Sequence, residues 1–481
     1  MRNEVLRGEH ICVSDRNVNL LSDLNFDLNE GEILGVCGLR DSGKTTLIDV
    51  MTGRRKMTQG ALYYHGRKIT GKELSEEKAV VDIRKQSKLI PDLTVYDNMT
   101  LLSPMPLFPD MAKTKWTREI REIFHALDLS FDLNRKVRHL SRAEHYFLEI
   151  CRGILNHVSV FVITDITYDC SIDEYRKLRE ILRILRKRGA SILYIESVID
   201  RLLGWTDRIL VMREGRDVFV FDRKSQSREN LLKALGVTDP MEMQIPDRAG
   251  SAAKTEMPDE AVFSLSNFMF DEVRCEELVV HRGEIAGFVH ENTKPPEELM
   301  RLFRGEALIH SGKAVINGQT ADFRRGIESL ISMGMGIFDG NREDGFYNQS
   351  VLHNILISSY PYVSGFLVSR REEETLAEEA LSMAGIRMQD AGKMFSDLSH
   401  FEREKILFEK WALTRPAVLF IDNPFRFMDI RLLEWFRVYL TQLRMENVAV
   451  LYTMPYDRQY TSMADSLYGF IGNRLISIRD S

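Results

Sequence analysis

Residues Gly38–Thr45 read GLRDSGKT and fit the pattern G-x-x-x-x-G-K-S/T. The stretch directly follows a short apolar run, Ile33 to Val36, and opens a run from Thr46 to Met51 that can form a helix. Glycines in such a strand–loop–helix turn let backbone N–H groups surround a phosphate, and the helix N-terminus adds positive potential. The sequence therefore predicts a phosphate-binding loop at these residues.

The residue types in this loop indicate the ligand. A lysine at the position of Lys44 reaches the β- and γ-phosphate oxygens, and a hydroxyl at the position of Thr45 can bind Mg²⁺. We therefore expect ATP with Mg²⁺ as the bound group. The candidate ATP-binding residues are Gly38, Leu39, Arg40, Asp41, Ser42, Gly43, Lys44, Thr45 and Thr46.

The composition is that of an ordinary globular protein, with 481 residues, 44% hydrophobic and 28% charged, which excludes wholesale disorder. A net charge of −6 argues against a surface built to bind nucleic acid. The five scattered cysteines indicate a reducing compartment. The longest apolar run, around Val158 to Ile163, is far shorter than the ~20 residues of a membrane-spanning helix. We expect a soluble, intracellular protein that reaches a membrane only through partners.

The chain contains an internal repeat. GEILGV at Gly31–Val36 returns as GEIAGF at Gly283–Phe288, and Leu-Ser at 140–141 returns at 398–399. The apolar run before Thr164 likewise returns before Asp422. Because these landmarks keep their order and nearly their spacing, they indicate two copies of a whole domain and not a solenoid of short repeats.

Each half alternates short β-branched runs, such as Ile192 to Ile195, with helical patterns. This alternation predicts an α/β fold with a mostly parallel sheet in each domain. We expect a first domain over residues 1–236 and a second over 261–481. Residues 237–260 contain three prolines among small and charged residues, which is typical of an exposed linker.

Nearly the whole chain resembles the tandem ATP-binding subunits of ABC importers, especially those for ribose, galactose and similar sugars. The resemblance rests on the Gly38–Thr45 loop, on LIPDLTVYDN at Leu89–Asn98, on the paired Leu-Ser signatures and on TRPAVLFIDNP at Thr414–Pro424. The sugar branch is favoured by the tandem fusion and by GIFDGNREDG at Gly336–Gly345.

This resemblance implies two tandem P-loop NTPase domains of the ABC type, each with a helical subdomain around its signature. It also implies a cytoplasmic subunit at the inner face of the cell membrane, docked on membrane permease subunits and served indirectly by a solute-binding protein. The transported substrate would be selected by those partners, and no nucleic acid is expected.

Several motif positions in the first half depart from the family pattern. Lys85 stands at the Q-loop glutamine, with Gln86 one place late as a candidate metal ligand. Spacing from the second signature puts Thr164 at the family's Mg²⁺-binding Asp and Asp165 at its catalytic Glu. Asp165 is therefore the candidate for a weak catalytic base or a magnesium ligand, and Ser197 replaces the switch histidine.

The second half departs further. FVHENTKPP at Phe288–Pro296 keeps no glycine nest, and Asn423 stands where the family has its catalytic Glu. The signature serines, Ser141 and Ser399, are retained. The glycine two places after each serine is replaced, by Ala143 in the first half and by Phe401 in the second.

These replacements leave alternatives open. The leading hypothesis is an ATP-binding subunit for carbohydrate uptake that binds ATP at one site and hydrolyses it slowly or not at all. The alternative is a catalytically silent pseudo-ATPase with a regulatory or scaffold role. A third hypothesis, a ribosome-associated ABC protein, is disfavoured by the net negative charge.

Overall fold

The chain forms two compact units, Met1–Thr238 and Asp239–Ser481, each described by itself below. The expected linker lies almost wholly outside the described residues. The computed structural model describes residues 3–15, 18–101, 109–166, 170–237, 260–290, 294–340, 345–358, 375, 377–378, 381–382, 384–455 and 458–478.

The first unit is built around a six-stranded sheet with the strand order β10-β9-β3-β8-β7-β6. All neighbours are parallel except β10, which returns antiparallel to β9. The strands are β3 (Ile33–Gly38), β6 (Val80–Arg84), β7 (Val160–Thr164), β8 (Ser191–Ile195), β9 (Arg208–Arg213) and β10 (Arg216–Asp222).

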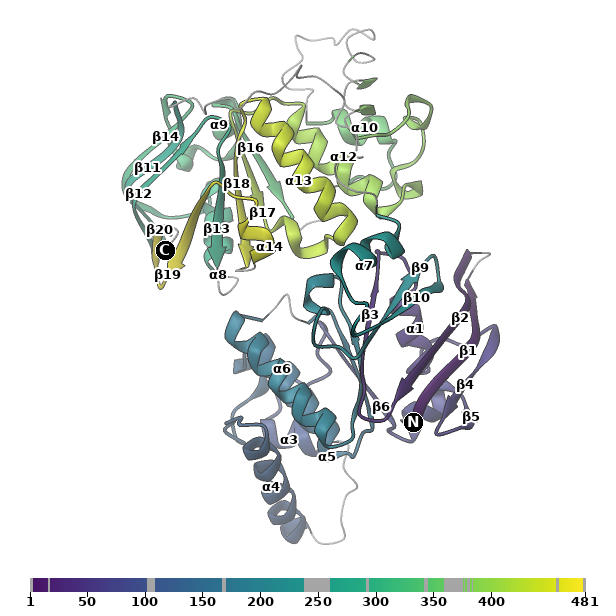
Figure 1. Ribbon diagram of the computed structural model, residues 1–481. Coiled ribbons are helices and arrows are strands. Elements are labelled where there is room, and N and C mark those ends of the chain that lie inside the picture. The colour runs from purple at the N-terminus through teal and green to yellow at the C-terminus, as the bar shows by residue number, and fades with distance from the viewer. Residues whose placement is uncertain are drawn as a thin grey trace. The chain divides into compact units, whose positions relative to one another are not determined.

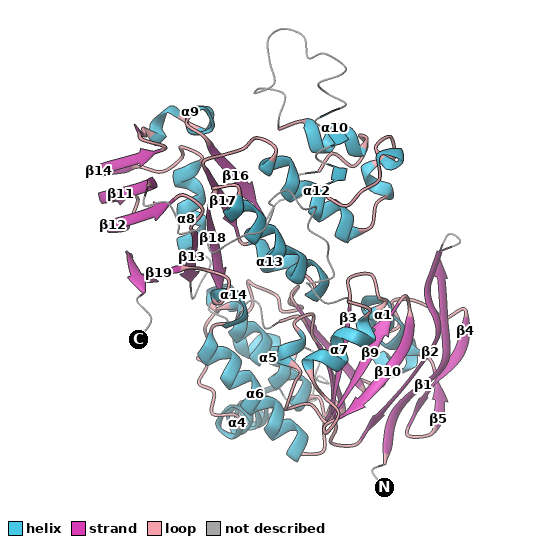
Figure 2. Cartoon of the chain, turned by 45° about the horizontal axis from the view of Figure 1, so that its top comes forward, coloured by secondary structure: helices cyan, strands magenta, loops and turns pink. Residues whose placement is uncertain are grey.

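A second, antiparallel sheet has the order β2-β1-β4-β5. Helix α1 (Lys44–Met51) packs between this sheet and the parallel one, because its apolar side chains share a core with strands of both (Figure 2). The strands are β1 (Glu4–Asp15), β2 (Val18–Asn29), β4 (Gln59–Tyr64) and β5 (Arg67–Ile69).

A helical subdomain completes the first unit. In Figure 1, α3, α4 and α5 lie together at one end of the unit, where they pack on one another. The helices of the unit are α2 (Gly71–Glu76), α3 (Val95–Thr100), α4 (Pro109–Ala126), α5 (Arg142–Leu155), α6 (Ile172–Lys187) and α7 (Arg228–Leu235).

The second unit repeats this topology. Its ten strands run β15-β14-β11-β12-β20-β19-β13-β18-β17-β16, which is the order of the first unit with the two sheets joined where β12 pairs with β20. The strands are β11 (Ala261–Phe270), β12 (Val273–His281), β13 (Ile285–His290), β14 (Ile309–Ile316), β15 (Gln319–Thr320), β16 (Met335–Asp339), β17 (Val418–Asp422), β18 (Ala449–Pro455), β19 (Ser466–Ile471) and β20 (Arg474–Ile478).

The prediction of two tandem α/β domains is therefore confirmed. The second unit also has its own helices around the signature, with α10 and α12 in contact. No helix within the described ranges is long and apolar enough to cross a membrane. The helices are α8 (Lys294–Phe303), α9 (Ile327–Ser332), α10 (Val351–Leu356), α12 (His400–Ala412), α13 (Ile430–Met445) and α14 (Arg458–Thr461).

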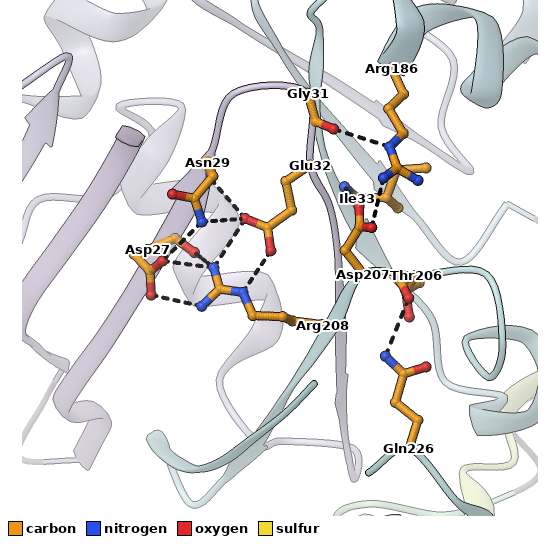
Figure 3. A network of polar contacts seen from close by, with 10 residues as sticks. All are labelled: Asp27, Asn29, Gly31, Glu32, Ile33, Arg186, Thr206, Asp207, Arg208 and Gln226. Atoms are coloured by element: carbon orange, nitrogen blue, oxygen red, sulfur yellow. Dashed lines mark hydrogen bonds and ion pairs between the residues drawn. The ribbon is translucent and has the colours of Figure 1, made fainter. Parts of the chain in front are cut away.

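A network of charges around the buried Glu32 joins the two sheets of the first unit beside β3 (Figure 3). Arg208 of β9 bonds through Nε to Glu32 Oε1 at 2.6 Å and pairs through Nη2 with Asp27 Oδ2 of β2 at 2.7 Å. The hydrogen bond to Glu32 holds the pKa of Arg208 above its ordinary value. Asn29 donates two further bonds to Glu32, so this buried carboxylate is enclosed by donors.

We expect Arg208→Ala to lower the free energy of unfolding by about 3 kcal/mol, because the buried Glu32 would lose its ionic partner. Urea unfolding followed by tryptophan fluorescence measures the change. Arg67→Ala is the matched control, since Arg67 and its partner Glu77 are both exposed, and it should leave the midpoint unchanged. Equal effects of the two substitutions would contradict the assignment.

Candidate functional site

The predicted phosphate loop connects the buried carboxyl end of β3 to the start of α1. The strand includes Gly38, so it is longer than the apolar run that predicted it. Gly43 then adopts φ 95°, where a Cβ would lie 2.6 Å from the Leu21 side chain and 2.9 Å from the Leu20 carbonyl. Both the positive φ and the close backbone neighbour require glycine at this position.

The loop is fixed from below by backbone hydrogen bonds. The Gly215 N–H, in the turn between β9 and β10, donates to the Ser42 carbonyl at 3.1 Å. The carbonyl of Gly215 in turn accepts from Ser22 N–H of β2 at 2.9 Å. The Ser42 side chain is buried, whereas Arg40, Asp41 and Thr45 are exposed. The backbone bonds and the buried Ser42 therefore hold the loop in place, while Arg40, Asp41 and Thr45 face solvent.

Lys44 lies over this loop. Its ammonium donates to the carbonyls of Gly38 at 2.5 Å and Leu39 at 2.8 Å. The Lys44 ammonium and the first backbone N–H groups of α1 therefore lie at the same end of the helix, an arrangement that favours binding of an anion. Cys37, one residue before Gly38, is buried, and burial raises the pKa of its thiol to about 12 although Lys44 acts in the opposite direction. This thiol is not a nucleophile at neutral pH.

The carboxyl edge of the parallel sheet brings further candidate residues beside the loop strand. Val36, Ile195, Thr164 and Arg84 stand in register across β3, β8, β7 and β6. Thr164 ends its strand, and its buried Oγ1 has no hydrogen-bond partner. The position where the family has a metal-binding carboxylate is therefore neutral and lies next to an arginine.

Asp165 follows in the left-handed region, with φ 46°. Its Oδ1 accepts from the backbone N–H of Ser197 at 2.8 Å, and its own N–H donates to the Ile195 carbonyl. The structure thus brings together Asp165 and Ser197, which the motif spacing predicted at the positions of a catalytic Glu and a switch histidine. One oxygen of the Asp165 carboxylate is therefore already engaged by the backbone.

Gln86 is exposed in the turn after β6. The following residues of that turn are held by Glu149 of α5, which accepts from Ser87 Oγ at 2.6 Å and from Lys88 N–H at 2.8 Å. Burial raises the pKa of the Glu149 carboxyl despite these bonds. The turn that carries Gln86 is therefore tied to the signature helix.

Both signature serines are helix N-caps. Ser141 accepts from Glu144 N–H and Ser399 from Glu402 N–H, and each glutamate reaches back to its serine, which completes a capping box. This role was not predicted from the sequence, although the S-x-x-E spacing signals it. Ala143 is buried, and Phe401 packs beneath the Arg431 guanidinium at 4.1 Å from its ring centre. Phe401 therefore has a cationic partner within its own unit.

The second unit differs from the first after its central strand. Strand β13 ends at His290 and α8 begins at Lys294, whereas β3 ends at Gly38 and α1 begins at Lys44. Two prolines occupy the first turn of α8, where they remove N–H donors. Lys294 is the first residue of this helix.

The second unit keeps a carboxylate where the first has lost one. Asp422 ends β17 and accepts from Thr453 Oγ1 at 2.5 Å, with Asp339 beside it in register. Asn423 repeats the left-handed conformation of Asp165, with φ 50°. The phosphate loop therefore lies in the first unit, whereas the aspartate at the end of the strand lies in the second.

Magnesium finds a poor set of ligands in the first unit. Among the described residues, no group of three or more His, Cys, Asp or Glu side chains can hold a metal ion. Thr45 and Asp165 offer oxygens, but Thr164 is neutral and adjoins the cationic Arg84. Mg²⁺ is usually bound through one or two carboxylates together with substrate phosphates. Because Asp165 already accepts from Ser197 N–H and Thr164 supplies no carboxylate, the residues present fit the predicted metal poorly.

The structure adds a cluster of charges that was not predicted from the sequence. Asp82 of β6 is buried and lies within 2.8 Å of Arg54, 2.7 Å of Arg84 and 3.4 Å of Lys88. Burial acts to raise the pKa of Asp82, but these cations outweigh it and hold the pKa below its ordinary value. The Asp82–Arg84 alternation along one strand was the available signal, since residues two apart share a face.

Comparison with known proteins agrees with this geometry. A model of the ABC transporter family matches residues 21–167. The chain is 25% identical over 433 residues to the galactofuranose transporter ATP-binding protein YtfR of Escherichia coli, covering 89% of this chain and 86% of that protein. It is 24% identical over 436 residues to the ribose import ATP-binding protein RbsA of Caldanaerobacter subterraneus, with the same coverage.

The arabinose import ATP-binding protein AraG of Yersinia pestis is 25% identical over 457 residues, covering 93% of this chain and 86% of that protein. Among solved structures, a nucleotide-free ATP-binding cassette from an ABC transporter is 24% identical and covers 48% of this chain and 95% of its own, with a TM-score of 0.41.

The repeated strand order gives the chain two tandem α/β domains, each with a helical subdomain, and the family model and the relatives make it similar to P-loop NTPases of the ABC type. Within that class, it is related over most of its length to the ATP-binding subunits of sugar-type ABC importers, as its motifs predicted.

We expect Gly43→Ala to destabilise the first unit by more than about 1 kcal/mol, because the added Cβ would meet the Leu20 backbone as well as adopt an unfavourable φ. Gly66→Ala is the matched control, since Gly66 also has a positive φ but an added Cβ there would meet nothing within 4 Å. Calorimetry of the full chain should show the larger loss for Gly43→Ala. A larger loss for Gly66→Ala would refute the importance of the close approach.

The buried Asp82 carboxylate predicts a pH dependence. Because its folded pKa lies below the unfolded value of about 3.9, its stabilisation is present above that pH and is lost as pH falls through the folded pKa. Asp82→Asn should therefore destabilise the chain at pH 7, and the difference from wild type should shrink below about pH 4.

Urea midpoints measured at pH 7 and pH 3.5 test this prediction. Asp128→Asn serves as the control, because Asp128 also pairs with a lysine but is exposed, and it should have no measurable effect at either pH. An Asp82→Asn penalty that stays constant across this range would contradict the predicted pH dependence.

Proposed function

We propose that this chain is the ATP-binding subunit of an importer for a carbohydrate, which binds ATP at Gly38–Thr46 and acts on a separate membrane permease. The observation that carries the proposal is the strand–loop–helix geometry of this loop in the first unit, with Lys44 over it. The relation to galactofuranose, ribose and arabinose import proteins over most of the chain supports the choice of a sugar importer.

Binding of ATP at the loop follows from the donors gathered there. The triphosphate would take the Lys44 ammonium from the carbonyls of Gly38 and Leu39, and the first N–H groups of α1 would donate to its oxygens. The exposed Thr45 hydroxyl lies at the same helix end. These interactions need no part of the second unit's altered loop.

Hydrolysis is expected to be slow. The position of the family's catalytic Glu is the shorter Asp165, and one of its oxygens already accepts from Ser197 N–H. Losing a positioned general base typically lowers a rate by about 10²–10⁴-fold. In this proposal, ATP binding and release, rather than rapid turnover, change the state of the subunit.

As an importer subunit, the chain would have defined partners and a defined location in the cell. The chain would lie in the cytoplasm at the inner face of the membrane, contact it only through permease subunits, and receive substrate indirectly from a solute-binding protein. The loop would bind the phosphates of ATP whichever sugar is transported. The partner proteins would therefore select the sugar.

A regulatory pseudo-ATPase is the second candidate. It is favoured by the two prolines in the first turn of α8, which remove N–H donors where a phosphate would need them. In that case ATP would stabilise one conformation of an assembly without being turned over. Import and regulation differ in their partners, since only the first requires a permease that co-purifies with the chain.

We expect ATP to raise the melting temperature of the full chain, and Lys44→Ala to abolish that shift because the loop loses its ammonium. Lys72→Ala, an exposed lysine on α2, is the matched control and should keep the shift. Phosphate release should stay near background for wild type. Rapid, Lys44-dependent release would overturn slow hydrolysis, and no shift at millimolar ATP would overturn ATP binding.

A further inference from the structure

The end of β7 differs from what a metal-bound triphosphate requires. Thr164 carries no charge, is the last residue of its strand, and has a buried Oγ1 without a partner. Its neighbour in register on β6 is Arg84, about 5 Å away at the Cα atoms. A cation adjoins the place where a divalent metal would need a carboxylate.

Arg84 is incompletely satisfied in its present position. Its Nη2 lies 2.7 Å from Asp82 Oδ2 and 3.5 Å from Asp49 Oδ1, but neither Nε nor Nη2 has a hydrogen bond of acceptable geometry. A guanidinium has five N–H donors and binds phosphate oxygens in pairs. Both nitrogens are buried, so an oxygen-rich ligand can reach these donors only if the guanidinium turns away from Asp82.

The surrounding charges favour such a ligand. Three cations, Arg54, Arg84 and Lys88, surround the carboxylates of Asp49 and Asp82. This leaves the cluster with one surplus positive charge at the edge of the sheet that contains the loop strand. Asp82 would keep Arg54 and Lys88 if Arg84 turned toward a ligand, so no buried carboxylate would be left alone.

The second unit provides an internal comparison. Asp339 occupies the position of Arg84 there, next to Asp422 in register, and it pairs with Arg304. The second unit therefore keeps two adjacent carboxylates at this edge. The unit with the loop has a threonine and an arginine at the same two positions.

We propose that the nucleotide site of the first unit binds ATP without a divalent metal, with the Arg84 guanidinium supplying positive charge in the metal's place. This inference rests on the proposed ATP binding at Gly38–Thr46 and specifies the form of the ligand. It explains why Thr164 is compatible with a retained phosphate loop, since a carboxylate there would pair with Arg84 and cancel its charge.

The test measures the affinity of the full chain for a fluorescent ATP analogue, once with 5 mM MgCl₂ and once with EDTA. We expect the two dissociation constants to agree within less than tenfold. Arg84→Gln should weaken binding in EDTA by at least tenfold, because the site then lacks both cations. Arg84→Lys should bind more tightly than Arg84→Gln in EDTA because it keeps the charge.

Arg54→Gln is the matched control, since Arg54 also contacts Asp82 and Asp49 but lies beyond the C-terminal end of α1. Its affinity in EDTA should stay within threefold of wild type. Thr164→Asp should bind at least tenfold more tightly with Mg²⁺ than in EDTA. Circular dichroism checks that each variant is folded.

Wild-type affinity that falls tenfold or more in EDTA would overturn the inference while leaving ATP binding intact. An Arg84→Gln variant that is folded and binds like wild type in EDTA would overturn it as well. Absence of binding by wild type under both conditions would instead refute the proposed function. If Arg84→Gln does not fold, the wild-type comparison and Thr164→Asp still decide the question.

Discussion

The close approach between Gly43 and the backbone of β2 is the constraint on which the site depends. Because the loop passes so near Leu20, its geometry requires both a glycine and the antiparallel sheet that carries β2. The bonds through Gly215 connect the same loop to the β9–β10 turn. The phosphate loop is therefore a product of two packed sheets, which the Arg208–Glu32–Asp27 network holds together (Figure 3).

The two copies of the domain have diverged, and each copy retains a different part of the site. One unit retains a glycine loop on the same sheet as Thr164, whereas the other retains Asp422 at the end of the corresponding strand. Each copy nevertheless keeps its capped signature helix and its strand order. Packing and capping stabilise each unit by themselves, so the catalytic positions were able to change without loss of the fold.

Much of the organisation could be predicted from the residues because it depends on local chemistry. Gly38–Thr45 specified a strand, a loop and a helix in one stretch, and the repeated motifs specified the second copy. The roles of Ser141 and Ser399 as helix caps are equally local, since each depends on a glutamate three residues later. Only the Asp82–Arg84 pair of the charge cluster had a signal in the sequence, because α1 and the turn after β6 supply the other members from separate parts of the chain.

From the residues alone one can establish the duplication, the intact loop and the altered motif positions, since these are matters of residue type and spacing. Only three-dimensional packing puts Thr164 beside Arg84, engages Asp165 with Ser197 N–H, and gives the second unit a helix that starts soon after β13. The physical reason is that strand register and burial set the neighbours of a charged group, and neighbours determine whether that group can bind a metal, a proton or a phosphate.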